Sequence, residues 1–120
     1  MAPIRLRDDL RALLPLTPAT FYILFALADG EKHGYAIMQY CFQLSNGKFR
    51  MGPATLYTAI QRLLDLALIE ETRASHAGER RRRCYRLSRL GKLLLEAEIG
   101  RMEDIVRLAQ RREALANGTK

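Results

Sequence analysis

The sequence predicts a mainly helical α+β fold with four short helices, a two-stranded hairpin and one long final helix. Apolar residues recur at helical spacing through about the first 66 residues. The spacing then becomes that of two short strands between residues 68 and 87, and helical spacing returns from residue 88 onward. With 120 residues, 48% hydrophobic and 28% charged, the chain has the size and composition of one globular domain.

The predicted helices of the first half span about residues 4–14, 18–28, 33–45 and 53–66. Thr17 and Gly52 are the expected N-caps of the second and fourth helices, because each precedes a proline, which fits a first helical turn. Gly30 and Gly47 follow the second and third helices, where a glycine can adopt the left-handed conformation that ends a helix.

Residues 68–75 and 82–87 are predicted to form the hairpin, with Gly78 in its turn. Ser88 is the expected N-cap of a helix that reaches about Arg112, roughly 38 Å long. The chain is therefore divided into a body (1–87), a dimerisation helix (88–113) and a flexible tail (114–120).

The charge balance favours a polyanionic partner. Twenty Lys and Arg against thirteen Asp and Glu give a net charge of +7, which makes nucleic acid the leading partner class. A membrane surface is a weaker rival, because no helix combines a wholly basic face with a bulky apolar one. No apolar run approaches the roughly 18 residues of a membrane span, and no signal-peptide core follows residues 1–9. We expect a cytoplasmic protein.

The chain offers no pattern typical of catalysis or metal binding. Cys41 and Cys84 are far apart and form no Cys-x-x-Cys pair, so buried thiols are expected. His33 and His76 have no neighbour at ligand spacing, and no metal or other cofactor is predicted. No serine or cysteine has a base at motif spacing and no phosphate-binding loop is present, which argues against an enzyme.

Two helices with a short connection, followed by a hairpin, correspond to the plan of a winged helix-turn-helix. In that plan helix 53–66 enters the major groove. With Leu56, Ile60 and Leu63 turned inward, the opposite face carries short, hydrogen-bonding or basic residues: Ala54, Thr55, Tyr57, Thr58, Gln61 and Arg62. Gln can read adenine and Arg can read guanine. On this helix alone, a merely solvated polar face is an equal alternative.

The hairpin favours nucleic-acid binding. Four arginines in a row stand at its second strand, and two more lie on the same hairpin: Arg80, Arg81, Arg82 and Arg83, with Arg73 and Arg86. So much like charge in a small turn repels itself unless phosphates neutralise it. We therefore predict an arginine-tipped wing that follows the DNA backbone or minor groove. The alternative, a merely soluble loop, would more naturally mix charges of both signs.

Several motifs resemble the PadR family of transcriptional regulators. They are residues 16–30 and 33–37, then 52–63 with 68–70, then 83–88 with Gly91, and the similarity covers roughly residues 16–110. The resemblance is to short members with a single C-terminal helix. It implies a homodimeric repressor that binds a palindromic operator and often responds to a small molecule. By motif position, Thr55, Tyr57 and Thr58 would meet DNA, while His33 and Tyr35 would lie near its backbone.

Two residues depart from the pattern of the family. Gly52 stands where a serine is usual, so a side-chain cap is missing, at a cost of a few tenths of a kcal/mol. Ala67 stands where a glycine usually ends the helix, and a left-handed alanine costs about 1 kcal/mol. The turn into the wing is therefore expected to differ from the family pattern.

The long helix carries a heptad-like seam with spacings of four, three, four and three: Leu95, Ile99, Met102, Val106 and Ala109. A second apolar row consists of Leu90, Leu94, Ile105 and Leu108. Two rows need two partners, the helix's own domain and a second copy of the chain, unless one domain covers both. A two-fold dimer would place its two copies of helix 53–66, the recognition helix that enters the major groove, about 34–36 Å apart.

Aromatic and thioether side chains suggest a cavity at the dimer interface for a small aromatic effector: Tyr35, Met38, Tyr40, Phe42 and Met102. Ordinary core packing is the alternative for this set. The alternative to a DNA-binding regulator is a basic winged-helix adaptor that contacts protein or RNA without operator specificity.

Overall fold

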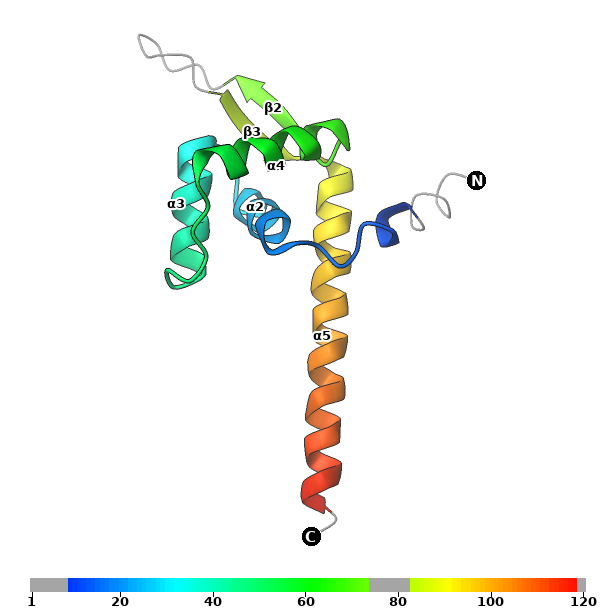
Figure 1. Ribbon diagram of the computed structural model, residues 1–120. Helices are drawn as coiled ribbons and strands as arrows, with labels where there is room; N and C mark the ends of the chain where they lie inside the picture. Colours follow the sequence, from blue (N-terminus) through cyan, green and yellow to red (C-terminus); the bar gives the residue numbers. More distant parts are fainter. Residues whose placement is uncertain (1–8, 74–82, 119–120) are drawn as a thin grey trace.

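The computed structural model describes residues 9–73 and 83–118. Residues 9–11 are helical. The elements that follow are α2 (Pro18–Ala28), β1 (Lys32–His33), α3 (Gly34–Leu44), α4 (Pro53–Asp65), β2 (Ile69–Arg73), β3 (Arg83–Leu87) and α5 (Arg89–Gly118). The predicted mainly helical α+β fold is confirmed. Helices α2–α4 and a small sheet form a body, and α5 leaves this body as a single rod (Figure 1).

The predicted starts of α2, α4 and α5 are confirmed by their capping geometry, whereas the start of the predicted helix 4–14 lies outside the described residues. The Thr17 hydroxyl accepts a hydrogen bond from the Thr20 N–H at 3.2 Å, with Pro18 in the first turn of α2. The Ser88 hydroxyl accepts from the Gly91 N–H at 3.0 Å at the start of α5. Gly52 caps α4 without a side-chain hydrogen bond. These local signals therefore placed the helix starts correctly.

The sheet contains three antiparallel strands in the order β1-β3-β2, one more than the sequence predicted. β2 and β3 pair from Ile69 opposite Leu87 to Arg73 opposite Arg83. The additional strand, β1, has only two residues, which lie opposite Tyr85 and Cys84. Two residues are too few to show a strand periodicity, so β1 is defined only by its pairing with the free edge of β3.

One hydrophobic core connects all the helices of the body with the sheet and the first turns of α5. The fully buried side chains include Ile23, Leu24, Ile37, Leu56, Ile60, Leu68, Tyr85 and Leu94. Cys41 and Cys84 are buried as expected and form no disulfide. Burial raises the pKa of the Cys41 thiol to about 11, so this thiol stays protonated at neutral pH.

Helix α4 ends in a Schellman motif with alanine at the left-handed position. Ala67 has a φ of 60°. Its N–H donates to the Leu64 carbonyl at 3.0 Å, and the Leu68 N–H donates to the Leu63 carbonyl at 2.9 Å. The Ser88 hydroxyl donates to the Ala67 carbonyl at 2.7 Å, which joins this turn to the start of α5. Alanine thus adopts the conformation for which glycine is usual, and contacts with α5 support it.

Helix α5 is longer than predicted. It continues to Gly118 rather than ending near Arg112, so residues 114–118 are helical and not the predicted tail. Gly91 lets it approach the body, because a Cβ there would collide with the Leu68 carbonyl oxygen. The radius of gyration is 17.5 Å, against about 14 Å for a compact chain of this length. In the described parts of the chain, no helix has the length and hydropathy of a bilayer span.

Candidate nucleic-acid interface

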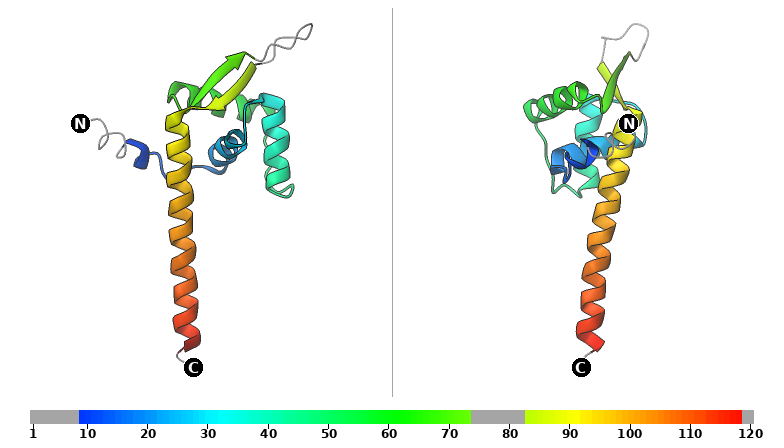
Figure 2. Two further views of the ribbon diagram at one scale, coloured as in Figure 1. Left: turned by 180° about the vertical axis from the view of Figure 1, so that it is seen from behind. Right: turned by 90° about the vertical axis from the view of Figure 1, so that its right-hand side faces the viewer.

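Helix α4 presents the predicted polar residues on its solvent side. Leu56, Ile60 and Leu63 are buried in the core. The candidate residues are all exposed: Thr55, Tyr57, Thr58, Gln61 and Arg62. At 100° per residue, Thr58 lies opposite the buried stripe, and Gln61 and Arg62 lie on either side of Thr58. Tyr57 lies on the flank of the helix, nearer to the stripe. α4 and the hairpin lie at the end of the molecule farthest from the C-terminal end of α5 (Figures 1 and 2).

Tyr57 packs over the start of α3. A Cβ on Gly34 would collide with the Tyr57 hydroxyl oxygen and would lie 2.9 Å from its Cζ. Gly34 is therefore needed for close approach of the two helices, and any larger residue would displace the tyrosine. The Tyr57 side chain is still 49% exposed, so it can both fix the angle between α3 and α4 and contact a partner.

Gln61 is held by the neighbouring turn of α4. Its Nε2 donates to Oδ1 of Asp65 at 3.0 Å. Because the aspartate accepts through one amide hydrogen, the Gln61 carbonyl oxygen and its second amide hydrogen stay available. An adenine edge needs one acceptor and one donor, which this orientation provides.

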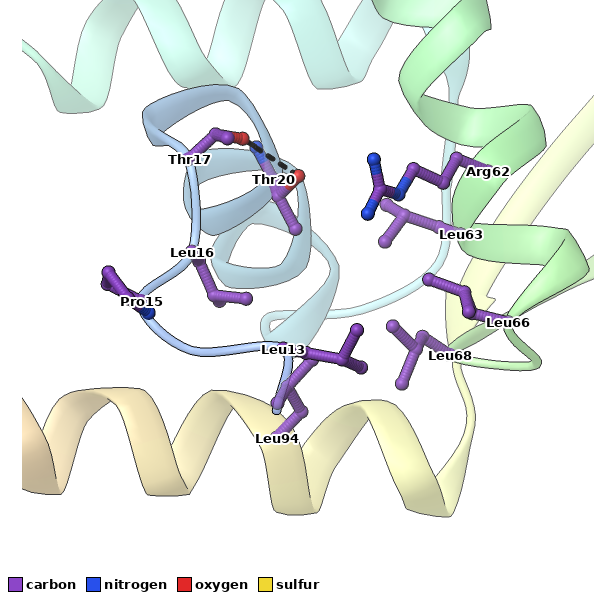
Figure 3. A pocket seen from close by; sticks show the side chains of 10 residues that line it. All are labelled: Leu13, Pro15, Leu16, Thr17, Thr20, Arg62, Leu63, Leu66, Leu68 and Leu94. Carbon is purple, nitrogen blue, oxygen red and sulfur yellow. Dashed lines mark hydrogen bonds between the residues drawn. The ribbon is translucent and has the colours of Figure 1, made fainter. Parts of the chain in front are cut away.

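Arg62 turns from α4 toward the N-terminal end of α2. Together with Thr17 and Thr20 it lines the polar side of a pocket of about 140 Å³ (Figure 3). Leucines and one proline from four parts of the chain line the rest of it: Leu13, Pro15, Leu16, Leu63, Leu66, Leu68 and Leu94. Arg62 also lines an open groove on the outer face of α4 with Thr58 and Gln61, so it borders both surfaces.

His33 and Tyr35 lie at the start of α3, as predicted. His33 is the N-cap, and its Nδ1 accepts from the Ala36 N–H at 3.3 Å. Its Nε2 then carries the proton in the neutral ring, which makes it a donor. Tyr35 is 59% exposed. Two hydrogen-bond donors are thus available where α3 begins.

At the base of the hairpin, arginines of β3 face glutamates of β2. Arg86 Nε lies 2.9 Å from Oε1 of Glu70, and Arg83 Nε lies 3.8 Å from Oε2 of Glu71. These pairs were not predicted from the sequence, although the two glutamates directly precede the basic segment. Because all four side chains are largely exposed, the pairs are weak and a phosphate can compete for either arginine. Arg80, Arg81 and Arg82 lie outside the described residues.

Charge is unevenly distributed along the chain. Residues 32–64, which include α3 and all of α4 except its last residue, Asp65, contain two lysines, two arginines and no aspartate or glutamate. The connection between these helices contributes Lys48 and Arg50, and the Arg50 guanidinium lies 5.2 Å from the centre of the Phe42 ring. This acid-free segment attracts an anion more strongly than the balanced composition of the remaining chain does.

Within one chain, the residues predicted to line an effector cavity at the dimer interface lie in different places. Tyr35, Met38 and Phe42 line an open groove with Gln39, Gln43, Arg50 and Met51. Tyr40 instead lies beneath the Lys32 ammonium, 4.5 Å from its ring centre. Met102 belongs to α5 and is not among the residues lining this groove. Spacing along single helices could not show which faces of α3 and α5 would meet.

The predicted dimer seam divides between two environments. Leu95 is buried in the core of its own body, and Ile99 and Met102 are half-buried. Val106 and Ala109 are exposed. The exposed part of α5 also carries Ile105, Leu108 and Leu115, which are 50%, 59% and 66% exposed. The contact with its own domain that the sequence predicts for α5 therefore extends only to about Met102.

Comparison with known proteins identifies the family. Residues 23–97, more than half of the chain, match the Transcriptional regulator PadR-like family. The chain belongs to this family. The PadR-like chain is 34% identical over 101 residues to Transcriptional regulator Rv3488 of Mycobacterium tuberculosis, covering 82% of this chain and 90% of the relative. It is therefore a transcriptional regulator, and the resemblance that its motifs suggested is confirmed.

Solved structures of PadR proteins share its fold. A PadR family transcription regulator from Clostridium difficile R20291 matches with a TM-score of 0.68 at 22% identity, over 79% of this chain and 97% of that one. Bacillus subtilis PadR, solved in complex with operator DNA, matches with a TM-score of 0.60 at 22% identity. That match covers 67% of this chain but 45% of the Bacillus protein, so the chain spans less than half of it. The predicted winged helix-turn-helix fold is confirmed.

Proposed function

We propose that this PadR-like regulator binds a palindromic operator as a homodimer and represses transcription there. The exposed face of α4 carries the proposal, because Thr58 projects directly away from the buried stripe with Gln61 beside it. The acidic residue of this helix, Asp65, is its last. The helix is narrow enough for a major groove, and these side chains can hydrogen-bond to base edges. The PadR structure from Bacillus subtilis, solved with operator DNA, supports the same reading.

Residues at the start of α3, on the flank of α4 and at the base of the hairpin would contact the DNA backbone. His33, Tyr35 and Tyr57 offer donors near the start of α3, and Thr55 and Arg62 lie on the flank of α4. Arg83 lies at the base of the hairpin that the sequence predicts to end in Arg80, Arg81 and Arg82. Backbone contacts of this kind set the register of the protein on the duplex, while Gln61 supplies sequence preference.

The homodimer would form through the exposed part of α5. On this part of the helix Ile105, Val106 and Leu108 are each at least half exposed, and exposed apolar side chains that gather on one surface mark an interaction site. A second copy of the chain supplies a matching apolar surface, because a two-fold axis pairs the same face of both helices. A palindromic operator has two equivalent half-sites, so two bodies are needed to bind it.

Selection from random duplexes with the purified protein tests the proposal. We expect selection to enrich a palindrome. Footprinting should show protection of this palindrome at salt concentrations that already abolish non-specific binding. Gln61→Ala should cost about 1–3 kcal/mol and relax preference at one base pair of each half-site. Gln110→Ala, which removes the same amide from exposed α5, is the matched control. An adaptor would give no footprint at any salt concentration, and that result would contradict operator binding.

We further propose that a small aromatic effector binds the pocket beside Arg62 (Figure 3). Its volume of about 140 Å³ resembles that of the roughly 150 Å³ cavity in which another protein binds benzene. A ligand there would contact α4 directly, and it can act only by binding one DNA-affinity state better than another. A thermal-shift screen with single-ring aromatic compounds should find a stabiliser whose effect Arg62→Ala reduces. No stabilisation at high ligand excess would contradict this proposal.

A further inference from the structure

The N-terminal segment is fastened to α5 by one buried side chain. Residues 12–17 cross α5 between the helical residues 9–11 and α2 (Figures 1 and 2). At this crossing the Leu16 N–H donates to Oε2 of Glu98 at 2.9 Å. Leu10, Leu13 and Leu16 pack against the core on either side of the crossing. The contact joins residues 82 positions apart in the sequence.

Glu98 is completely buried, and both of its carboxylate oxygens accept hydrogen bonds. Arg101 Nε donates to Oε1 at 2.6 Å, and Arg101 Nη2 donates to Oε2 at 3.2 Å. The hydrogen bonds from Arg101 hold the pKa of Glu98 below its usual range; burial opposes this effect, and the Leu16 N–H adds to it. The carboxylate is therefore charged at neutral pH and is held from two sides.

A buried ion pair of this kind contributes geometry more than stability. Hydrophobic residues of similar volume often stabilise such a position equally well or better. A leucine would also continue the apolar stripe of Leu94 and Leu95. A carboxylate, in contrast, accepts from fixed donors in defined directions, so it fixes the rotation and tilt of α5 against residues 12–17.

Glu98 is also the last buried residue of α5, because every side chain from Glu103 to Gly118 is exposed. The helix beyond Arg101 is about 26 Å long at 1.5 Å per residue. A tilt of about 10° at Glu98 would therefore move the far end of this segment by about 4–5 Å. One base pair of DNA rises by about 3.4 Å, so such a tilt matches the scale on which half-site spacing is measured.

We propose that Glu98 is a positioning residue for operator binding, which sets the separation of the two recognition helices through the angle at which α5 leaves the body. The inference rests on the dimeric DNA binding proposed above. In a dimer joined through residues 103–118 of α5, these two helical segments are fixed to each other. A change in the angle of α5 at Glu98 then rotates each body relative to the joined segments. The two-fold axis then doubles the effect of any change in angle on the distance between the α4 helices.

Glu98→Gln tests the proposal with little change in volume. Glutamine has one acceptor oxygen, so its amide nitrogen must face either the Leu16 N–H or the Arg101 guanidinium, and one contact is lost. Glu96→Gln, an exposed change two residues away with the same effect on net charge, is the matched control. Binding is measured on the selected half-sites at their native spacing, with one and two base pairs inserted or removed, and on a single half-site.

Wild type and Glu96→Gln should prefer the native spacing by about tenfold, since each inserted base pair also rotates one half-site by about 35°. Glu98→Gln should bind the single half-site like wild type but distinguish the spacings by less than about threefold. A wild-type preference in Glu98→Gln, or an equal loss on every duplex including the half-site, would overturn the inference. If Glu98→Gln does not fold, Arg101→Gln replaces it under the same criteria. A wild-type protein without any spacing preference would instead contradict the proposed dimeric function.

Discussion

The two parts of α5 have similar apolar patterns but different surroundings. Up to Arg101 the helix packs on its own body, with Leu94 and Leu95 buried and Glu98 sealed by two partners. From Glu103 onward every side chain is exposed, including Ile105, Val106 and Leu108. The comparison shows that an apolar pattern predicts burial without identifying the partner. The first part stabilises the fold, and the second part is available to another chain.

The largest expected effect of this difference is on stability. Leu94→Ala should lower the free energy of unfolding by about 2–5 kcal/mol, because it removes a fully buried side chain from the core. The same change in the distal part, Leu108→Ala, should alter the unfolding of the body by no more than about 0.5 kcal/mol. Urea denaturation at low protein concentration measures both. Equal losses in the two variants would contradict the division of α5.

The next largest effect is expected on assembly. Val106→Glu places a charge on the exposed apolar face, so dimers should dissociate and operator affinity should fall about 100-fold, since each half-site then binds alone. Arg107→Gln changes the net charge equally, on the side of α5 that faces away from Ile105 and Leu108, and is the control. Sedimentation velocity and operator titration provide the measurements. A Val106→Glu protein that remains dimeric would place the interface elsewhere.

The smallest effect concerns the junction between the two parts. The pKa of Glu98 is lowered in the fold from a value near 4.5. Its charge therefore stabilises the fold above about pH 4.5, and this contribution disappears as the pH falls through the lowered pKa. The difference in unfolding free energy between wild type and Glu98→Gln should shrink between pH 6 and 3, as urea denaturation at a series of pH values would show. A difference independent of pH would contradict a charged Glu98.

The recognition helix was predictable in detail because its signals are local. Pro53 after Gly52 marks its start, and the spacing of Leu56, Ile60 and Leu63 defines which side is buried. Once that side is known, the outward positions of Thr58 and Gln61 follow from helix geometry. The direction of Arg62 was not predictable, because it depends on where α2 lies.

The short strand β1, the pairing of Glu70 with Arg86 and the site of Glu98 were missed for a related reason. Helical spacing places Glu98 on the apolar stripe of Leu94 and Leu95 and Glu96 on the opposite side, but it does not show which donors meet the Glu98 carboxylate. Its partner at Leu16 is a backbone N–H, which every residue except proline has. A long-range contact to a backbone group leaves no residue pattern to detect.

The sequence by itself determined the order of the elements, the caps that begin them, the faces that become buried and the family to which the chain belongs. These properties depend on neighbours within a few residues, where backbone conformation and helical or strand periodicity act. Tertiary structure decided which apolar residues of α5 belong to its own core, which part of α2 Arg62 faces, and where a carboxylate is buried. Each of these depends on groups that meet only after the chain has folded, so their distances are set by packing and not by spacing along the sequence.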